Sequence, residues 1–409
     1  MTPTLYLTRN GLLEPLGQSQ VMAYLRGLSR DHAITLITYE KDEDRADSAR
    51  MAAARAECEA LGIRWLPQRF RPQPKVIAPA LSMLRMVWLL RREVRARNLR
   101  LIHARSYIPA AVAMAVSRMT GVPFIFDMRA LWPEELITAG RLRRGSFLHR
   151  RIVAAERICL RRAAGVVSLT HAAAEHLRRI YPEELKDQRL VVIPTCADLD
   201  RFVPTTSPAG RRVIGCLGTM LSGWFRVDWL RAFLEAGLRR DPTLEIELTT
   251  RDDPGRLREV LGPVLAERLV IAPARPDQVP SVLQGQFASV MFYAGGQVSE
   301  LGRSPTRMGE ILGCGLPVVA NEGVGDVARI IREHRVGILV RSAAPQDMES
   351  AWVELEALLT DPDLAARCRS AAEAVFSLPA GTDSYRRLYA DILGGWPGNE
   401  VKDHQECAD

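Results

Sequence analysis

Short apolar runs alternate with longer stretches in which apolar residues recur every three or four positions, from one end of the chain to the other. The short runs predict buried strands, and the longer spacing predicts amphipathic helices. In the first half we expect strands at 5–8, 33–38, 63–66, 100–104, 123–127, 165–169 and 190–194. Helices are expected between them, near 18–30, 46–61, 80–97, 109–120, 147–163 and 171–180. This alternation is typical of a parallel sheet with helices on both faces.

The pattern starts again near residue 211, with strands expected at 211–218, 244–250, 268–272, 288–293, 316–320 and 337–341. The predicted fold class is therefore α/β, with two doubly wound, Rossmann-like domains facing a central cleft. The expected parts are a first domain at 1–198, a linker rich in Pro, Thr and Ser at 199–212, and a second domain at 213–381. A last helix at 382–396 follows a Pro-Ala-Gly break and is expected to join the first domain.

The chain has 409 residues, which suits two domains of ordinary size. Its net charge of +7 comes from arginine and favours anionic partners such as phosphate groups. Seven scattered cysteines without a Cys-x-x-Cys pair favour a reduced, cytoplasmic protein with no disulfide framework and no zinc site. The amino terminus lacks the pattern of a signal peptide, and no apolar run is long enough to span a bilayer.

The first strand is followed by a glycine-containing turn, "TRNGLLEPLGQSQV". Gly17 would let the backbone approach a ligand, and the following helix start attracts anions. The glycine spacing is not that of a dinucleotide-binding fold, and we place the nearest acidic residue, Glu40, in a loop beyond the next strand. A nicotinamide cofactor is therefore weakly supported, and a plain strand-to-helix turn remains an equal alternative.

Charged residues follow the strand "FIFD", where Asp127 and Arg129 suit recognition of an acceptor or a sugar. His103, on the preceding strand, is a candidate acid, base or hydroxyl partner. The alternatives are a local pair between Asp127 and Arg129 and a structural histidine. In the second half, Gly218 and Arg226 follow the first strand as candidates for close backbone approach and phosphate binding. There the alternative is a flexible loop with a surface arginine.

The stretch "GRSPTRMGEILGCGLPVVA", residues 302–320, predicts a helix with Ser304 as its N-cap and Pro305 at its first position. Amide groups at this helix start, flanked by Arg303 and Arg307, would suit a diphosphate. Glu310 shares a face with Arg307. It is a candidate acceptor for ribose hydroxyls, with a simple salt bridge as the alternative.

Three segments together are similar to one known family. "SPTRMGEILGCGLPVVA" resembles the donor-site segment of retaining, family-4 glycosyltransferases with the GT-B fold (glycosyl transferase group 1). "YLTRNGLLEPLGQSQV" resembles the amino-terminal loop of that family, and "VVIPTCADLDRF" resembles its interdomain signature. The resemblance implies that Glu310 holds the ribose and that the amides of Thr306 and Arg307 hold the diphosphate. The sugar-contacting glutamate of the family falls on Gly302, with Glu300 nearby as a substitute.

The resemblance also implies a function. Such a protein moves a sugar from a nucleotide-diphosphate donor, UDP- or GDP-linked, to a glycan, lipid-linked or small-molecule acceptor in polysaccharide or glycoconjugate biosynthesis. Stabilisation of the departing diphosphate by Arg226, Arg303 and Arg307 fits a site without a metal or other cofactor. Two alternatives stay open: a GT-B protein that binds a nucleotide sugar or a partner without transfer, and a nucleotide-sugar epimerase.

Two segments are apolar and strongly basic, at 79–98 and 141–162. Basic amphipathic helices bind anionic headgroups, so we expect peripheral contact with the cytoplasmic membrane face. The alternative is a core-facing helix with a solvated basic side. Nucleic acid is a weaker candidate, because no known binding module is recognisable.

Overall fold

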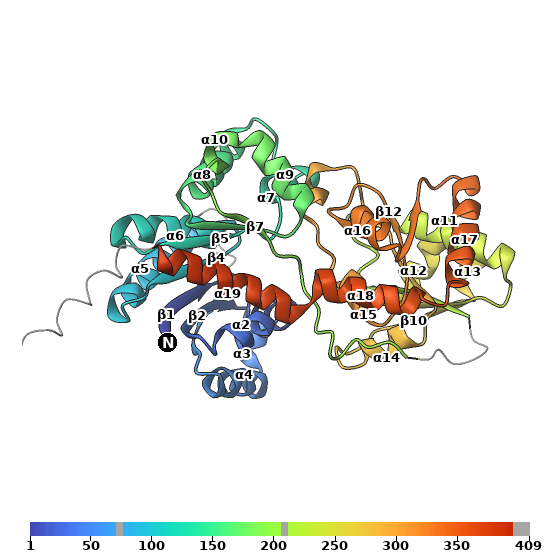
Figure 1. The fold of residues 1–409 in the computed structure, drawn as a ribbon, viewed down its shortest axis with the longest axis horizontal. Helices are drawn as coiled ribbons and strands as arrows, with labels where there is room; N and C mark the ends of the chain where they lie inside the picture. The colour runs from blue at the N-terminus through green and yellow to red at the C-terminus, as the bar shows by residue number, and fades with distance from the viewer. Residues whose placement is uncertain (71–76, 206–211, 396–409) are drawn as a thin grey trace, which may run out of the picture. The chain divides into compact units, whose positions relative to one another are not determined.

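The computed structural model describes residues 1–70, 77–205 and 212–395. They form two compact units, which Figure 1 shows with their elements labelled. The first unit contains Met1–Leu169, Ala173–Ile193 and the chain from Pro379 onward, and the second contains Thr170–Ala172 and Pro194–Leu378.

The first unit is built on a parallel sheet of seven strands in the order β3-β2-β1-β4-β5-β6-β7. Each of these strands overlaps one of the seven predicted for the first half. The strands are β1 (Thr2–Leu7), β2 (His32–Glu40), β3 (Arg64–Arg69), β4 (Leu101–Arg105), β5 (Phe124–Asp127), β6 (Gly165–Ser168) and β7 (Leu190–Val192). Their side chains are largely buried, as expected for a sheet covered on both faces.

The helices of the first unit connect successive strands. They are α1 (Pro15–Gly17), the π-helix η1 (Gln18–Met22), α2 (Ala23–Leu28), α3 (Asp42–Ala46), α4 (Ser48–Ala60), α5 (Ile77–Ala96), α6 (Tyr107–Thr120), α7 (Trp132–Thr138), α8 (Phe147–Arg162), α9 (His171–Ile180) and α10 (Pro182–Leu185). The helix α19 (Leu378–Gly394) returns from the far end of the sequence and lies along this sheet (Figure 1). Its Leu388 packs on Gly165, where a side chain on the glycine would collide with it.

The second unit has a parallel sheet of six strands in the order β10-β9-β8-β11-β12-β13. The strands are β8 (Val213–Leu217), β9 (Glu245–Thr249), β10 (Leu269–Ala272), β11 (Ala288–Met291), β12 (Val318–Asn321) and β13 (Gly337–Val340). The helical segments are α11 (Val227–Arg240), α12 (Pro254–Leu261), α13 (Pro263–Ala266), α14 (Val279–Gln284), the 3-10 turn η2 (Val298–Gly302), α15 (Thr306–Gly313), α16 (Val327–His334), α17 (Pro345–Leu359) and α18 (Leu364–Phe376). The predicted α/β class is confirmed for both units.

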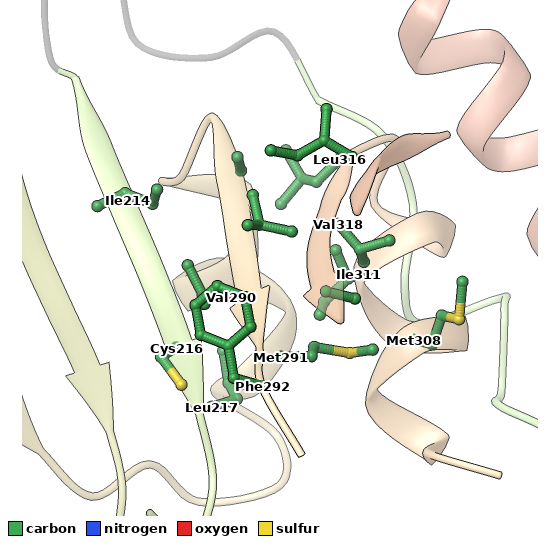
Figure 2. Packing of buried hydrophobic residues seen from close by; sticks show 14 of the residues in the cluster. Ile214, Cys216, Leu217, Val290, Met291, Phe292, Met308, Ile311, Leu316 and Val318 are labelled. Carbon is green, nitrogen blue, oxygen red and sulfur yellow. The ribbon is translucent and has the colours of Figure 1, made fainter. Parts of the chain in front are cut away.

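Helix α15 is fixed in the core of the second unit. Figure 2 shows its Met308 and Ile311 among the apolar side chains of the sheet. On its other side Gly309 meets Phe376, so that α15 and α18 approach closely. A Cβ on Gly309 would lie 2.7 Å from Phe376, which only glycine avoids. The start of α15 is therefore held by packing further along the helix.

The segment after β7 differs from the linker that we expected at 199–212. The amide of Ala197 donates to the Phe376 carbonyl at 2.8 Å, and Leu199 and Phe202 belong to the core of the second unit. The change between units comes at Ile193, because the apolar residues of this segment are buried beside α15 and α18. Residues 206–211 of the predicted linker lie outside the described residues.

Candidate functional site

Each sheet reverses its strand order at one place, between β1 and β4 in the first unit and between β8 and β11 in the second. Helices leave towards opposite faces at such a reversal, and ligands of open α/β sheets bind beside the carboxyl ends of those strands. Most of the predicted site residues follow these strands. The second unit is described first, and the first unit after it.

Gly218 and Arg307 come together at the reversal in the second unit. Gly218 follows β8 with a φ of +102°, a conformation that favours glycine. A Cβ built on it would lie 1.6 Å from Nη2 of Arg307, so the guanidinium occupies the space that a side chain would fill. Nη1 of Arg307 also donates to the hydroxyl of Tyr293 at 3.5 Å. A cation therefore lies against exposed backbone at the expected ligand position.

Tyr293 was missed by the sequence-based prediction, as was the residue that holds it. The side-chain oxygen of Asn321 accepts the Tyr293 amide at 2.8 Å, and its nitrogen donates to the Tyr293 carbonyl at 2.9 Å. These buried bonds fix the backbone that carries the tyrosine. A polar residue ending the apolar strand "VVAN" was a visible signal, but its partner Tyr293 follows a different strand, β11.

The start of α15 is displaced by one residue from the prediction. The helix begins at Thr306 with Pro305 as its N-cap, whereas we expected Ser304 to cap it. Ser304 lies one residue before this N-cap, and its hydroxyl accepts the amide of Thr195 at 3.1 Å. Pro305 has no side-chain group for capping, and the first amides of a helix have no acceptor within it. This helix start suits an anion.

Glu310 lies one turn further along α15. Its carboxylate forms no hydrogen bond or ion pair with any residue that the structure describes, including Arg307. Burial raises the pKa of Glu310, and the positive charge of Arg307 acts in the opposite direction. The salt bridge that was the alternative prediction is not formed. A partly buried acceptor without an internal partner is suited to sugar hydroxyls.

Glu300 and Arg303 form a pair with each other, which differs from the ligand-binding roles that we predicted. Glu300 is fully buried, and its two oxygens accept from Nε and Nη2 of Arg303 at 2.5 and 2.9 Å. The guanidinium also lies over the rings of Trp224 and Tyr293, at 5.2 and 5.4 Å from their centroids. Such cation–π contacts hold the arginine in place. Glu300 is therefore not placed to substitute for a glutamate at Gly302.

Arg226 forms its side-chain contacts with residues of its own segment. It is the N-cap of α11, and its guanidinium donates to both oxygens of Asp228 at 3.1 and 2.8 Å. The same group lies over the ring of Trp229, 5.0 Å from its centroid. The pair with Asp228 accounts for the position of the Arg226 side chain. This is close to the alternative of a surface arginine that the sequence left open.

In the first unit, Asp127 and His103 lie in one buried network with two tyrosines of α19. Asp127 accepts from His103 Nε2 and from the Tyr385 hydroxyl, both at 3.2 Å. Tyr389 lies 2.7 Å from His103 Nδ1. Burial lowers the pKa of His103, so the ring is neutral. An ionised Asp127 must accept, and therefore Nε2 carries the proton and Tyr389 donates to Nδ1.

Arg129 neutralises Asp127. Its Nη1 donates to Asp127 at 3.4 Å, and its Nη2 donates to the side-chain oxygen of Gln20 at 3.2 Å. Burial alone would raise the pKa of Asp127, but Arg129 and the bond from His103 hold it well below its usual range. The predicted trio is thus together, with both ring nitrogens of His103 already occupied. A second buried arginine, Arg105, was missed by the prediction.

Gly17 allows close packing of the amino-terminal loop. A Cβ on it would lie 2.1 Å from the carbonyl of Gly11, so the loop packs directly on the glycine. Glu40 is the last residue of β2, which corrects its predicted place in a loop. It is fully buried and accepts the amide of Leu12 at 2.8 Å and the hydroxyl of Thr38 at 2.6 Å. Glu40 therefore holds the loop instead of a cofactor ribose.

The comparisons with solved structures agree with this fold. Sucrose-phosphate synthase from Thermosynechococcus elongatus superimposes with a TM-score of 0.68 at 15% identity, over 96% of this chain and all of that one. HepE from Anabaena, solved in complex with UDP and glucose, gives a TM-score of 0.65 at 16% identity, over 95% of this chain and 99% of that one. At these identities the likeness establishes the fold.

Sequence comparisons establish the activity class. Residues 17–196 match the family of glycosyl transferase 4-like domains. A curated protein of Streptomyces fradiae, 2-deoxystreptamine N-acetyl-D-glucosaminyltransferase, is 27% identical over 319 residues, which is 74% of this chain and 68% of the relative. Together these comparisons support a glycosyltransferase of the family-4 type with the GT-B fold. The predicted resemblance to glycosyltransferases of the family-4 type with the GT-B fold is confirmed.

In this glycosyltransferase the predicted site residues divide into three groups. Gly218 and Arg307 lie together at the start of α15 with Glu310 one turn further along the helix, and His103, Asp127 and Arg129 form the network of the first unit. Thr306 is the first residue of α15, and the other predicted residues hold local structure. Among the described residues there is no group of three or more side chains arranged to bind a metal, and no helix with the length and hydropathy of a membrane span.

Proposed function

We propose that this glycosyltransferase takes its sugar from a nucleoside-diphosphate donor and that the second unit binds that donor. The observation that carries the proposal is the Arg307 guanidinium lying against the backbone of Gly218, at the carboxyl end of β8. A cation and a helix start whose N-cap residue, Pro305, forms no side-chain capping bond together offer what a diphosphate requires. Glu310, without an internal partner, would accept hydrogen bonds from the ribose.

The same groups would serve the transfer step. Charge develops on the diphosphate as the sugar leaves, and Arg307 with the first amides of α15 would stabilise it. No step of this scheme requires a metal. We propose transfer with retention of the anomeric configuration on the strength of the family resemblance. UDP and GDP are the proposed nucleotides, and the UDP bound to HepE favours the first.

We propose that the first unit binds the acceptor, near the network of His103, Asp127 and Arg129. His103 would act as a positioning residue for Asp127, since both of its ring nitrogens are occupied. The acceptor class is a glycan, a lipid-linked sugar or a small molecule, in polysaccharide or glycoconjugate biosynthesis. The Streptomyces relative is named for an N-acetylglucosamine donor sugar and a 2-deoxystreptamine acceptor, so both belong in an assay.

Gly302 favours the alternative of a protein that binds a nucleotide sugar without transferring it. It stands where the family has a sugar-contacting glutamate, and the buried pair of Glu300 with Arg303 does not replace it. A protein that binds a nucleotide sugar without transferring it would show this combination. The epimerase alternative is not favoured, because the curated relative is a glycosyltransferase.

A thermal-shift screen of UDP-, GDP-, ADP- and dTDP-sugars tests the proposal. We expect one nucleotide to stabilise the protein, with UDP-N-acetylglucosamine included among the donors. Release of nucleoside diphosphate with transfer to an added acceptor would separate the enzyme from a binding protein. Glu310→Ala should weaken binding of the nucleotide roughly 10- to 100-fold, the cost of hydrogen bonds to a charged group.

Glu333→Ala removes an exposed carboxylate from the same unit and is the matched control for that variant. Equal calorimetric affinities of Glu310→Ala and Glu333→Ala would reject the ribose role of Glu310. If no nucleotide sugar stabilises the wild-type protein and none is turned over, the proposed function itself fails.

We further propose that the first unit contacts an anionic membrane surface through α8. Phe147 and Leu148 begin this helix with 72% and 59% of their surface exposed. Arg151 lies over the Phe147 ring, and several other arginines follow along the helix. On α5, Trp88 is also exposed, with Arg92 over its ring. Apolar side chains bordered by arginines match anionic headgroups above acyl chains.

A further inference from the structure

Arg105 is buried in the first unit without a carboxylate partner. It ends β4, next to the reversal of strand order, and only 4% of its surface is exposed. Its Nη1 and Nη2 donate to amide oxygens, of Asn10 at 2.9 Å and of Gln20 at 2.7 Å. No acidic side chain lies within ion-pair distance of it among the described residues. A buried charge of this kind is costly unless something neutralises it.

A second buried arginine, Arg129, contacts the side-chain oxygen of Gln20. Arg129 also donates to the side-chain oxygen of Gln20, so two guanidinium groups share one neutral acceptor. Burial lowers the pKa of Arg105, and the neighbouring charge of Arg129 lowers it further. The Nε atoms of both arginines are buried and have no hydrogen-bond partner. With His103 neutral, Asp127 balances only one of the two charges.

The backbone beside Arg105 also favours an anion. Ser106 has a φ of +77°, which is strained for a residue with a side chain, and its hydroxyl does not cap the helix that follows. That helix, α6, has 14 residues and no acidic residue in its first turn. Gln20 itself lies on the π-helix η1, a form of helix that is frequent at functional sites.

We infer that Arg105 and Arg129 bind an anionic group, a phosphate or a carboxylate, which takes the place of the Gln20 oxygen, and that the acceptor of the glycosyltransferase carries this group. The inference rests on the proposed function only in calling the ligand the acceptor. Charged oxygens would satisfy the forked donors of both arginines, which one amide oxygen cannot do. Asn10, in the loop after β1, would border the same group.

The test uses the full chain with its donor site saturated by UDP, so that phosphate is not bound there. Inorganic phosphate is titrated by calorimetry at constant ionic strength set with chloride. Arg105→Gln should weaken phosphate binding at least about tenfold. Gln20→Ala removes the competing oxygen and should strengthen it. Arg118→Gln, an exposed arginine of the same unit, is the control with the same charge change.

Glucose 6-phosphate, glucuronate and glucose distinguish the two anionic groups, and glucose should not compete with inorganic phosphate. Absence of phosphate binding, or equal affinities in wild type, Arg105→Gln and Gln20→Ala, would overturn the inference. Gln20→Ala decides the matter if Arg105→Gln does not fold. UDP binding and donor turnover are measured separately, so their failure would reject the proposed function and leave the anion site standing.

Discussion

Arg303 and Arg307 stand four residues apart in the sequence and have different surroundings. Arg303 is fixed by Glu300 and two aromatic rings, while Arg307 lies over the backbone of Gly218. The sequence placed both at one helix start and could not separate them. Their difference arises from Glu300 and Trp224, which the fold brings to one of the arginines and not to the other.

We predict that Arg307→Ala impairs nucleotide binding, whereas Arg303→Ala impairs stability. Arg307→Ala should weaken UDP binding roughly 10- to 100-fold, with a smaller effect on uridine, because only the diphosphate needs the cation. Arg303→Ala should instead lower the free energy of unfolding by about 3–5 kcal/mol, because Glu300 is left buried and unpaired. Calorimetry and urea unfolding measure these effects.

The matched control is Arg329→Ala, an exposed arginine of α16 that should change neither measurement greatly. Loss of UDP binding in a stable Arg303→Ala protein would contradict this division of roles. So would an Arg307→Ala variant that binds UDP and uridine with unchanged affinities.

The elements followed the hydrophobic pattern closely, and the exceptions have physical reasons. The helix expected near 18–30 follows the short α1 and is divided into η1 and α2, and its π-helical part carries Gln20. Periodicity does not reveal such a turn, because one extra residue leaves the apolar spacing almost unchanged. The last helix begins at Leu378, before the predicted break, since Pro379 is tolerated in a first turn.

At this scale we predict that α8 controls lipid binding. The double variant Phe147→Ser and Leu148→Ser should reduce co-sedimentation with phosphatidylglycerol vesicles, because it removes the exposed apolar side chains. Binding of the wild type should fall as salt rises, since attraction between arginines and lipid headgroups is screened. Phosphatidylcholine vesicles supply the uncharged comparison.

Val264→Ser, which changes an exposed apolar residue of the second unit, is the control for that experiment. No co-sedimentation of the wild type at low salt would reject the membrane proposal. Equal binding by both serine variants would show that another surface is responsible.

For the whole molecule, the first unit should be the part that is sensitive to acid. His103 is neutral in the fold with a lowered pKa, whereas an unfolded histidine titrates near ~6.5. The unfolded chain therefore binds the proton first, and stability falls as pH decreases below about 6.5. The pKa of Asp127 is lowered in the fold. The stability that its ionised carboxylate contributes is therefore lost only at lower pH, below ~4.

We predict that His103→Gln makes the free energy of unfolding less dependent on pH between 7 and 5, although it lowers stability at pH 7. His32 also has a pKa lowered by burial, so part of the dependence should remain. Urea unfolding across this range measures the slope, with His334→Gln in the second unit as control. An unchanged slope in His103→Gln would contradict the prediction.

The amino-acid sequence was sufficient to predict the alternating strands and helices, the two α/β halves and the family resemblance. Burial of apolar faces follows local periodicity, and the motifs are contiguous, so both can be recognised without tertiary contacts. The contacts between polar groups became known only from the three-dimensional fold. Tyr385 reaches Asp127 across more than half of the chain, Gln20 accepts from Arg105 and Arg129, and Arg307 covers Gly218. Such pairings depend on strand order and helix packing, which no local spacing specifies.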